Sequence, residues 1–286
     1  MVIDKISIVC VTRNDNYGIN QKERLVHFLK SIPKHRCIEE LIIVEWNPLP
    51  NCENMYELIS GMLLDLPYRV RIITVPTSIH RRFGSAAPVV EFCGKNVGIL
   101  RATGSYVLCT NPDVIFPTEM FDYIAKNGLR KDCFYRAMRV DVARELAFER
   151  CDNIIELARS NILKEHSDWC GRLFFNACGD FTLVNKEVWI KAGGYIQSND
   201  FFVHLDSEML FHLNRNFRLK QVVLPFSVYH IDHGRRQGRF LYRGQPIPSD
   251  TAGILGFCSG LRKRYKATRM GFPLLKLSEV HLFFSL

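Results

Sequence analysis

The sequence contains no CxxC pair, no zinc-type spacing of cysteine and histidine, no internal repeat and no low-complexity segment. Its ten cysteines are scattered, and Cys10 and Cys109 lie inside apolar runs, where cysteine usually acts as a small buried hydrophobic residue. These absences argue against a disulfide scaffold and a structural zinc module. No apolar run is long enough to span a bilayer, and the amino-terminal run is too short for a signal peptide. We therefore expect a cytoplasmic protein.

The composition is that of an ordinary globular protein. The chain has 286 residues, of which 47% are hydrophobic and 12% aromatic, so it is long enough to form a full core. Its net charge is +9, from 38 Lys and Arg against 29 Asp and Glu. A basic balance favours anionic partners such as nucleotides, nucleic acid or acidic membrane surfaces. No RNA-binding signature with interleaved aromatic residues is present, so we do not expect a nucleic-acid partner.

The first part of the chain alternates strand and helix patterns. Short apolar, β-branched runs end in polar residues, which is typical of strands buried on both faces of a parallel sheet. Helical spacing of apolar residues fills the intervals, and Gly98 inside one helix indicates either close packing or the approach of a ligand. This series predicts an α/β fold with a Rossmann-like, mostly parallel sheet and helices on both faces. The predicted strands are 6–11, 41–44, 68–75 and 106–109.

After Pro117 the pattern becomes mixed. We expect helices at 120–124, over most of 145–162, near Val188 and at 205–213, and strands at 133–142, 179–184, 219–224 and 227–231. The chain lacks an obvious flexible linker, so we expect one domain over residues 1–286. It would comprise a nucleotide-type half (1–117), a mixed half (118–234) and a basic tail (235–286).

One strand end carries the strongest local signal. The apolar run 106–109 stops at Asn111-Pro112-Asp113 and is followed by a second apolar pair. Ligands of open α/β sheets bind just beyond the carboxyl ends of such strands. The alternative is that Asn-Pro-Asp only forms a turn that ends the strand.

An ordered set of segments extends this signal over most of the chain. From residue 6 to about 233, their order and spacing resemble those of GT-A fold glycosyltransferases, in particular single-domain, family-two-like enzymes that use nucleotide sugars. The similar segments are ISIVCVTRN (6–14), LIIVEWN (41–47), residues 94–116, GDFTLVNKEVWIKAGGY (179–195) and HLDSEML (204–210).

The resemblance implies a GT-A type fold whose mixed half binds the acceptor. It implies an enzyme that transfers a hexosyl or pentosyl group from a UDP- or GDP-linked sugar to a hydroxyl group of a glycan, lipid or protein, assisted by Mn²⁺ or Mg²⁺. Inversion at the anomeric carbon is the expected outcome. The alternative is a non-catalytic module that binds a nucleotide or nucleotide sugar and has a degenerate metal site.

The expected metal site departs from the family pattern. Where the family has Asp-x-Asp, this chain has Asn111-Pro112-Asp113, and Asn111 offers only a neutral carbonyl. Hard cations can use one carboxylate together with diphosphate oxygens and water, so Asp113 can still serve as a ligand. The resemblance also implies a late histidine ligand, either His230 or His233. Strand alternation would place these two on opposite faces, so we expect only one to face the site.

Two acidic residues are candidates for the catalytic base. Asp206 and Glu208 lie at the expected start of a helix, and an inverting transfer needs a base that takes the proton of the acceptor hydroxyl. The alternative is capping of this helix, which does not exclude catalysis. Asp206 matches the family's acidic position better.

The resemblance assigns nucleotide contacts to the first two strand ends. Thr12, Arg13 and Asn14 follow the first predicted strand, and Glu45 ends the second, where it can accept a hydrogen bond from a base or ribose. The alternative is ordinary turn chemistry and solvation of loops.

Further candidates lie on the helix before Asp113 and in the mixed half. Lys95, Asn96 and Arg101 offer groups that can pair with a diphosphate, although helical geometry does not allow all of them to reach one ligand. Asp180 is a candidate for binding acceptor hydroxyls, against the alternative of a structural turn. Trp189 is a candidate for stacking on a sugar ring, although buried packing is the more common role of tryptophan.

The tail concentrates positive charge beside an apolar segment. Such a combination is typical of peripheral contact with anionic membranes, but also of a helix that packs on the core and exposes a basic face, which we favour. The sequence does not indicate the oligomeric state. The segments concerned are the arginines of 235–243, the basic run 262–269 and the apolar stretches 272–277 and 280–286.

Overall fold

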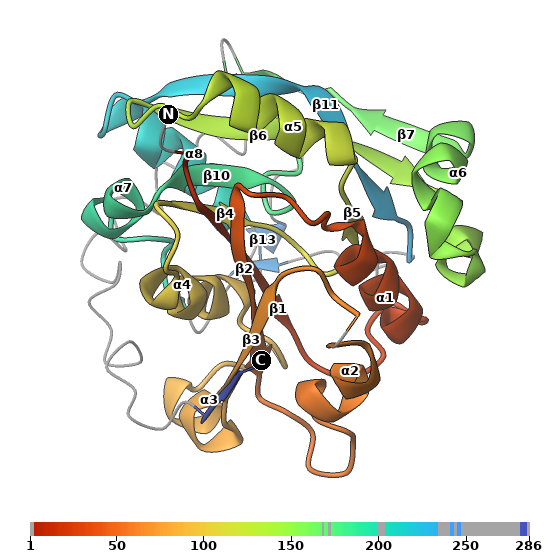
Figure 1. Ribbon diagram of the computed structural model, residues 1–286. Helices are drawn as coiled ribbons and strands as arrows, with labels where there is room; N and C mark the ends of the chain where they lie inside the picture. Colours follow the sequence, from red (N-terminus) through yellow and green to blue (C-terminus); the bar gives the residue numbers. More distant parts are fainter. Residues whose placement is uncertain are drawn as a thin grey trace.

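The chain is described by a computed structural model that covers residues 3–63, 65–167, 169–170, 173–198, 204–233, 241–242, 245–246 and 281–284. Its centre is a ten-stranded sheet in the order β14-β3-β2-β1-β4-β10-β6-β11-β5, with β7 paired to β6 (Figure 1). The elements are β1 (Ile6–Thr12), α1 (Gln21–Ser31), β2 (Ile38–Trp46), α2 (Met55–Leu63), β3 (Arg69–Val75), α3 (Thr77–Phe83), α4 (Glu91–Arg101), β4 (Tyr106–Cys109), β5 (Val114–Ile115), α5 (Thr118–Asn127), β6 (Cys133–Val142), η1 (Arg144–Phe148), η2 (Cys151–Asn153), α6 (Ile154–Ser160), β7 (Ile162–His166), β8 (Trp169–Cys170), β9 (Leu173–Phe174), β10 (Thr182–Asn185), α7 (Lys186–Lys191), α8 (Leu205–Arg215), β11 (Lys220–Ile231), β12 (Leu241–Tyr242), β13 (Gln245–Pro246) and β14 (His281–Phe284).

Most strands of the sheet point in one direction. β1 pairs in parallel with β2 and β4, and β2 pairs in parallel with β3. β10 is antiparallel to both β4 and β6, so β6 and its parallel neighbour β11 run in the same direction as the first four strands. The predicted α/β class with a mostly parallel sheet is therefore confirmed, and the sheet continues from the first half of the chain into the second.

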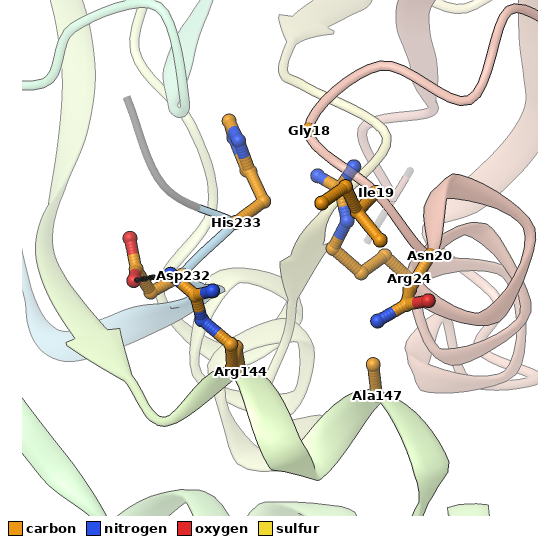
Figure 2. A pocket seen from close by; sticks show the side chains of 8 residues that line it. All are labelled: Gly18, Ile19, Asn20, Arg24, Arg144, Ala147, Asp232 and His233. Carbon is orange, nitrogen blue, oxygen red and sulfur yellow. Dashed lines mark hydrogen bonds and ion pairs between the residues drawn. The ribbon is translucent and has the colours of Figure 1, made fainter. Parts of the chain in front are cut away.

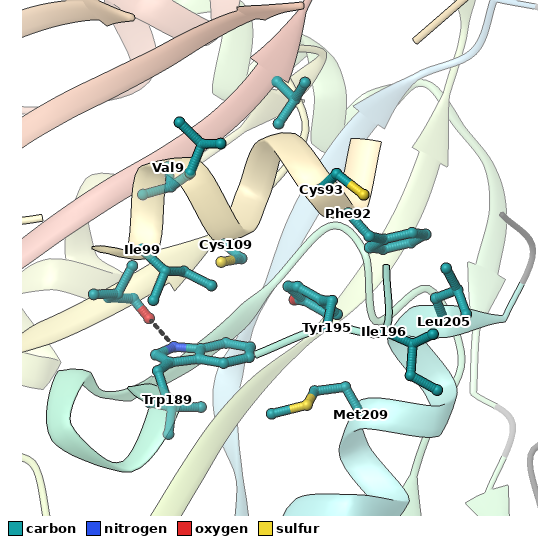
Figure 3. Close-up of a cluster of buried hydrophobic side chains, with 14 of the residues drawn as sticks. Val9, Phe92, Cys93, Ile99, Cys109, Trp189, Tyr195, Ile196, Leu205 and Met209 are labelled. Carbon is teal, nitrogen blue, oxygen red and sulfur yellow. Dashed lines mark hydrogen bonds between the residues drawn. The ribbon is translucent and has the colours of Figure 1, made fainter. Parts of the chain in front are cut away.

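Helices cover both faces of this sheet. The side chains of β1 point alternately to one face and to the other. Because successive strand side chains alternate in direction, Ile8 and Cys10 enter one apolar cluster while Val9 and Val11 enter another. The first cluster includes residues of α1, α2 and α5, and the second includes residues of α4, α7 and α8. Figure 3 shows the second cluster, in which Trp189 packs near Tyr195 beside α4 and α8.

Glycines bring α4 close to the sheet. A Cβ atom at Gly98 would lie 2.4 Å from the side chain of Val9, and one at Gly94 would lie 2.7 Å from that of Val11. Contacts this short do not occur between real atoms, so these positions require glycine while α4 rests on β1. Of the two explanations for Gly98, the structure supports close packing. This packing fixes the amino-terminal end of α4 near the carboxyl ends of β1 and β4.

Some predicted elements differ from those observed. The strands expected at 219–224 and 227–231 form the single strand β11, with an irregular register between Val223 and Ser227, where Pro225 lacks an N–H donor. The segment 145–162 contains η1, η2 and the short α6, and Ile162 already begins β7. Helix α3 was not expected, because its seven residues are too few to show a clear helical period.

The predicted basic tail lies almost entirely outside the described residues. This applies to the arginines of 235–243, the run 262–269 and the apolar stretch 272–277. Within the last apolar stretch, 280–286, the residues His281–Phe284 form β14. This strand pairs antiparallel with β3. Within the described ranges, no helix combines the length and the apolar character needed to cross a bilayer.

Candidate active site

Asp113 lies in the short connection between β4 and β5, at the carboxyl edge of the sheet. β5 pairs antiparallel with the end of β11, and this register places His230 opposite Val114, the residue after Asp113. Residues more than one hundred positions apart are thereby brought together. The pairing explains how a late histidine reaches the strand end that the sequence marks as a ligand site.

Three side chains converge at this point. Oδ2 of Asp113 lies 3.3 Å from Nε2 of His233 and 3.6 Å from Nε2 of His230. One ligand atom from each residue lies within 4.8 Å of the other two, a spacing that can hold one metal ion. We refer to Asp113, His230 and His233 as the candidate metal site.

Both histidines approach Asp113, so the prediction that only one would do so is wrong. Alternation ends with β11 at Ile231, and the chain leaves the strand before His233. The loop after β1 then packs on this histidine. A Cβ atom at Gly18, where φ is +69°, would lie 2.4 Å from Nδ1 of His233, and the ring of Tyr17 lies edge-on at a centroid distance of 5.1 Å.

A buried arginine fixes the carboxylate of Asp113. Arg24 projects from α1, is only 2% exposed, and donates from Nη1 to Oδ2 of Asp113 at 3.0 Å. Its Nη2 donates to the carbonyl of Tyr17. The other carboxylate oxygen, Oδ1, is buried without a hydrogen-bond partner among the described residues, as is Nδ1 of His233. Because buried polar atoms are normally paired, the unpartnered Oδ1 of Asp113 is suited to a ligand, whereas Nδ1 of His233 faces Gly18.

The electrostatics of the site favour a charged carboxylate. Burial alone raises the pKa of Asp113, but the neighbouring His230 and His233 outweigh burial and hold this pKa well below its usual range. Burial lowers the pKa of His230, but the Asp113 carboxylate and the contact with Asp141 raise it overall to about 9. In the metal-free protein at neutral pH, a protonated His230 therefore faces an ionised Asp113.

We expect Mn²⁺ affinity to rise with pH, because a proton and the metal compete for His230. Its pKa is raised from 6.5 to about 9, so below about pH 9 binding must displace this proton, and Kd should fall about tenfold per pH unit. The same shift stabilises the metal-free protein fully below pH 6.5, and this stabilisation is lost as the pH rises through about 9.

Calorimetric titration with Mn²⁺ from about pH 6.5 to about pH 8.5 measures the first effect, and thermal unfolding in EDTA measures the second. His233→Asn removes the other histidine of the candidate metal site but keeps His230, so its affinity should be lower and should still rise with pH. An affinity that does not change with pH would contradict the assignment of His230 as a ligand.

A small pocket adjoins the candidate metal site. Figure 2 shows Arg24 entering it from α1 and His233 from the end of β11, with Arg144 paired to Asp232 nearby at 3.5 Å. Its volume is about 30 Å³, close to the space of one water molecule. It therefore suits solvent beside the metal site rather than a whole nucleotide sugar.

Asn111 does not point into the candidate metal site. Its Oδ1 accepts a hydrogen bond from Nζ of Lys95 at 2.9 Å, and its Nδ2 donates to Oδ1 of Asp180 at 2.7 Å. The Lys95 ammonium is fully buried and also bonds Glu91 and the carbonyl of Gly179. An amide satisfies both neighbours, whereas an aspartate would face the carboxylate of Asp180. Both functional groups of the Asn111 side chain are thus already engaged within the protein.

The two candidate bases occupy different environments. Asp206 is partly exposed at the start of α8, and its Oδ2 would lie 3.2 Å from a Cβ atom at Gly179. Oε1 of Glu91 lies 3.8 Å from the same point, so two carboxylates flank Gly179. Glu208 is fully buried, which keeps an acceptor hydroxyl away from it. Of the pair predicted from the sequence, only Asp206 is accessible to a substrate.

Thr12 ends β1, and Arg13 and Asn14 follow it at the sheet edge, where all three side chains already make hydrogen bonds. Thr12 accepts a hydrogen bond from Gln21, Arg13 pairs with Asp15 at 2.7 Å, and Asn14 donates to the carbonyl of Glu53. Arg13 and Asn14 retain some exposure.

Glu45, at the end of β2, is only 1% exposed. It accepts from the backbone N–H of Met55 at the start of α2 and from the hydroxyl of Thr74. Glu45 therefore anchors α2 to the sheet. Because its carboxylate is buried and already bonded within the protein, it is not accessible to a nucleotide.

Four further sequence candidates have structural roles instead. Asn96 is buried and makes two hydrogen bonds with the backbone of Tyr195. Trp189 is fully buried and donates to the carbonyl of Val107, so it cannot stack on a sugar. Arg101 ends α4, about 15 Å of helix away from its amino-terminal end. Asp180 is 2% exposed and held by Asn111 and by Arg139, at 2.7 Å each, which leaves little access for an acceptor.

Other polar residues near the site have little or no signal in the sequence. Arg24 and Glu91 lie in ordinary amphipathic helices, and nothing in the local pattern separates them from surface charges. Arg139 and Asp141 give a weak signal, because residues two apart on a strand share a face and a charged face is unusual on a buried strand. Only the pairing of β6 with β11 brings these two residues beside His230.

Comparison with known proteins gives matches at the level of structure alone. No family model matches the sequence, and neither does any curated protein. GalNAc-T7, solved with UDP, GalNAc and Mn²⁺, aligns with a TM-score of 0.55 at 11% identity, over 92% of this chain and 49% of that one. TarS of S. aureus (1–349) aligns with a TM-score of 0.51 at 13% identity, over 79% and 60% of the two chains.

A weaker likeness is to the mannosyltransferase PcManGT from Pyrobaculum calidifontis in complex with GDP-Man and Mn²⁺, with a TM-score of 0.47 at 14% identity, over 83% of this chain and 59% of that one. This chain thus spans between one half and three fifths of the length of these proteins. At such identities the likeness concerns the fold. Together with the sheet described above, the two stronger matches show that this chain has the GT-A fold of glycosyltransferases.

Proposed function

We propose that this protein is a glycosyltransferase that moves a hexosyl or pentosyl group from a nucleotide sugar to an acceptor hydroxyl with the help of a divalent metal ion. The observation that carries the proposal is the candidate metal site, Asp113 with His230 and His233, at the carboxyl edge of a GT-A sheet. Ligands of open α/β sheets bind at this edge. The order of the sequence motifs further favours a family-two-like enzyme.

The donor atoms suit a divalent transition-metal ion. Asp113 offers a buried, unpartnered Oδ1, and His230 and His233 each turn Nε2 toward its carboxylate. Two imidazoles with one carboxylate favour a transition metal over Mg²⁺, which prefers oxygen ligands. When bound, such an ion neutralises the charge that develops on a diphosphate leaving group. Mn²⁺ in the GalNAc-T7 structure supports the same choice.

The chain's own residues take the remaining roles. Arg24 holds the Asp113 carboxylate in place, and Arg13 and Asn14 contact the donor beyond β1. Asp206 accepts the proton of the acceptor hydroxyl as that oxygen attacks the anomeric carbon, which gives inversion. Glu91, whose Oε1 lies near the same point at Gly179 as the Asp206 carboxylate, offers a second carboxylate to acceptor hydroxyl groups. A glycan, a lipid and a protein are all compatible acceptors.

A panel of nucleotide sugars, screened by thermal unfolding with and without Mn²⁺, tests the proposal. A ligand that binds only the folded protein at about one hundred times its Kd adds about 2.7 kcal/mol to the free energy of unfolding. We expect one UDP- or GDP-linked sugar to raise the melting temperature by several degrees, and to do so only when Mn²⁺ is present. A panel without any such ligand would contradict the proposal.

The same screen separates an enzyme from a non-catalytic binding module. A donor that stabilises the protein is next incubated with it, and the released nucleotide is measured. Release of UDP or GDP, to water or to an added acceptor, supports the enzyme. A donor that binds but stays intact for days, with simple glycosides present as acceptors, supports the module.

A further inference from the structure

We propose that Asp141 is a positioning residue that keeps the proton of His230 on Nδ1 and thereby leaves Nε2 free for the metal ion. Oδ1 of Asp141 lies 3.1 Å from Nδ1 of His230, while Nε2 of the same ring faces Asp113. The inference deepens the proposed function, because it rests on His230 being a metal ligand.

The sheet itself produces this contact. β6 and β11 run in parallel, and their register places Asp141 directly beside His230. The carboxylate is held from its other side by β7, because Nε2 of His166 lies 2.7 Å from Oδ2 of Asp141. His166 and His230 are 4% and 6% exposed, so bulk water does not compete for these groups. The orientation of the carboxylate is thus set by three neighbouring strands.

Nδ1 of His230 has a second neighbour besides Asp141, and the two neighbours favour different positions of the ring proton. Nη2 of Arg139 lies 3.0 Å from the same Nδ1 of His230. A guanidinium can only donate, whereas an ionised carboxylate can only accept. If Nδ1 carries the proton, it donates to Asp141 and leaves the lone pair of Nε2 for a ligand. If Nδ1 accepts from Arg139, a neutral ring carries its proton on Nε2, which blocks metal binding there.

The surroundings of Arg139 favour the first arrangement. Its Nε donates to Oδ1 of Asp141 at 2.6 Å, and its Nη1 donates to Oδ2 of Asp180 at 2.7 Å. Two carboxylates therefore already hold the guanidinium, while Asp141 is the carboxylate within hydrogen-bond distance of Nδ1 of His230. Carboxylates that orient metal-binding histidines in this way contribute about 10–100-fold to metal affinity. We infer the same contribution here.

Asp180 supplies a matched control. Asp141 and Asp180 each accept from Arg139, both lie largely inside the protein, and only Asp141 contacts His230. Asp141→Ala and Asp180→Ala therefore remove the same charge from the same arginine. Asp141→Asn keeps an oxygen that can accept from Nδ1 and should recover part of the lost affinity.

Titration with Mn²⁺ alone, followed by the EPR signal of free Mn²⁺, measures the effect. We expect Asp141→Ala to weaken binding about 10–100-fold, Asp141→Asn to lie between it and the wild type, and Asp180→Ala to stay within about threefold of the wild type. Equal affinity of Asp141→Ala and wild type, or equal losses in the two alanine variants, would overturn the inference. Absence of binding to the wild type would instead overturn the proposed function.

A second measurement needs no variant, in case Asp141→Ala does not fold. With Zn²⁺ as a diamagnetic probe, ¹⁵N spectra of the wild-type protein report which nitrogen of His230 carries hydrogen. We expect a hydrogen-bonded proton on Nδ1 and the metal on Nε2. A proton on Nε2, or metal on Nδ1, would contradict the role of Asp141.

Discussion

Asp113→Asn is expected to lower kcat/KM for sugar transfer by about a thousandfold or more. Asp113 supplies the only carboxylate of the candidate metal site, and a bound metal ion contributes several kcal/mol to stabilising a charged leaving group. Each 1.36 kcal/mol corresponds to a factor of ten in rate. Radiolabelled transfer from the donor found in the screen, at saturating Mn²⁺, measures the loss.

The fold should survive this change, with a measurable loss of stability. The buried guanidinium of Arg24 would then face a neutral amide instead of a carboxylate, and the loss of this charged partner costs about 1–3 kcal/mol. Asp232→Asn is the matched control, because it removes one charge beside the same pocket and leaves the three residues of the candidate metal site in place. If Asp113→Asn keeps wild-type activity, the metal site is assigned to the wrong residue.

Asp206→Asn is expected to lower kcat by about a hundredfold to ten-thousandfold, the usual contribution of a general base. Asp206 is the accessible acid at the start of α8, and an amide of the same shape cannot take a proton. Binding of Mn²⁺ and of the donor should be unchanged, because Asp206 is not part of the candidate metal site. A comparison of kcat with the Kd of the donor separates these effects.

Glu208→Gln provides the contrast. Glu208 is fully buried, so its replacement should change the melting temperature more than kcat. An NMR assignment of the anomeric configuration of the product completes the test. Full activity of Asp206→Asn, or a product with retained configuration, would show that Asp206 is not the base.

The sequence predicts the sheet well because a strand that is buried on both faces is encoded by a short run of consecutive apolar residues. β1 and the segment 41–44 of β2 contain apolar runs rich in β-branched residues, and β6 was predicted with its observed bounds, 133–142. The polar group at the end of β4 could be found for the same reason. Asp113 interrupts apolar residues at a place where the chain must leave the sheet.

The rest of the site depends on pairings between distant segments. The register of β11 against β5 and β6 decides that His230 meets both Asp113 and Asp141, and no local pattern encodes it. The period of two also fails at His233, because the strand has ended at Ile231. A strand period applies only while backbone pairing continues.

Buried polar residues are the hardest to interpret from sequence. Asn96 and Trp189 have the chemistry of ligand-binding groups, yet they bond the backbone inside the core. Lys95 is predicted from the sequence to be able to pair with a diphosphate, yet it lies fully buried between Glu91 and Asn111. Composition shows that such groups exist, but only the packed structure shows which partners satisfy them.

The proposed function depends most on Mn²⁺ being bound by the two late histidines. Pulsed EPR of Mn²⁺ bound to the wild-type protein in the presence of UDP or GDP detects ¹⁴N nuclei in the first coordination sphere. We predict imidazole nitrogen couplings that weaken in His230→Ala and His233→Ala and vanish when both are replaced. A spectrum that contains only couplings from water and phosphate would contradict the account.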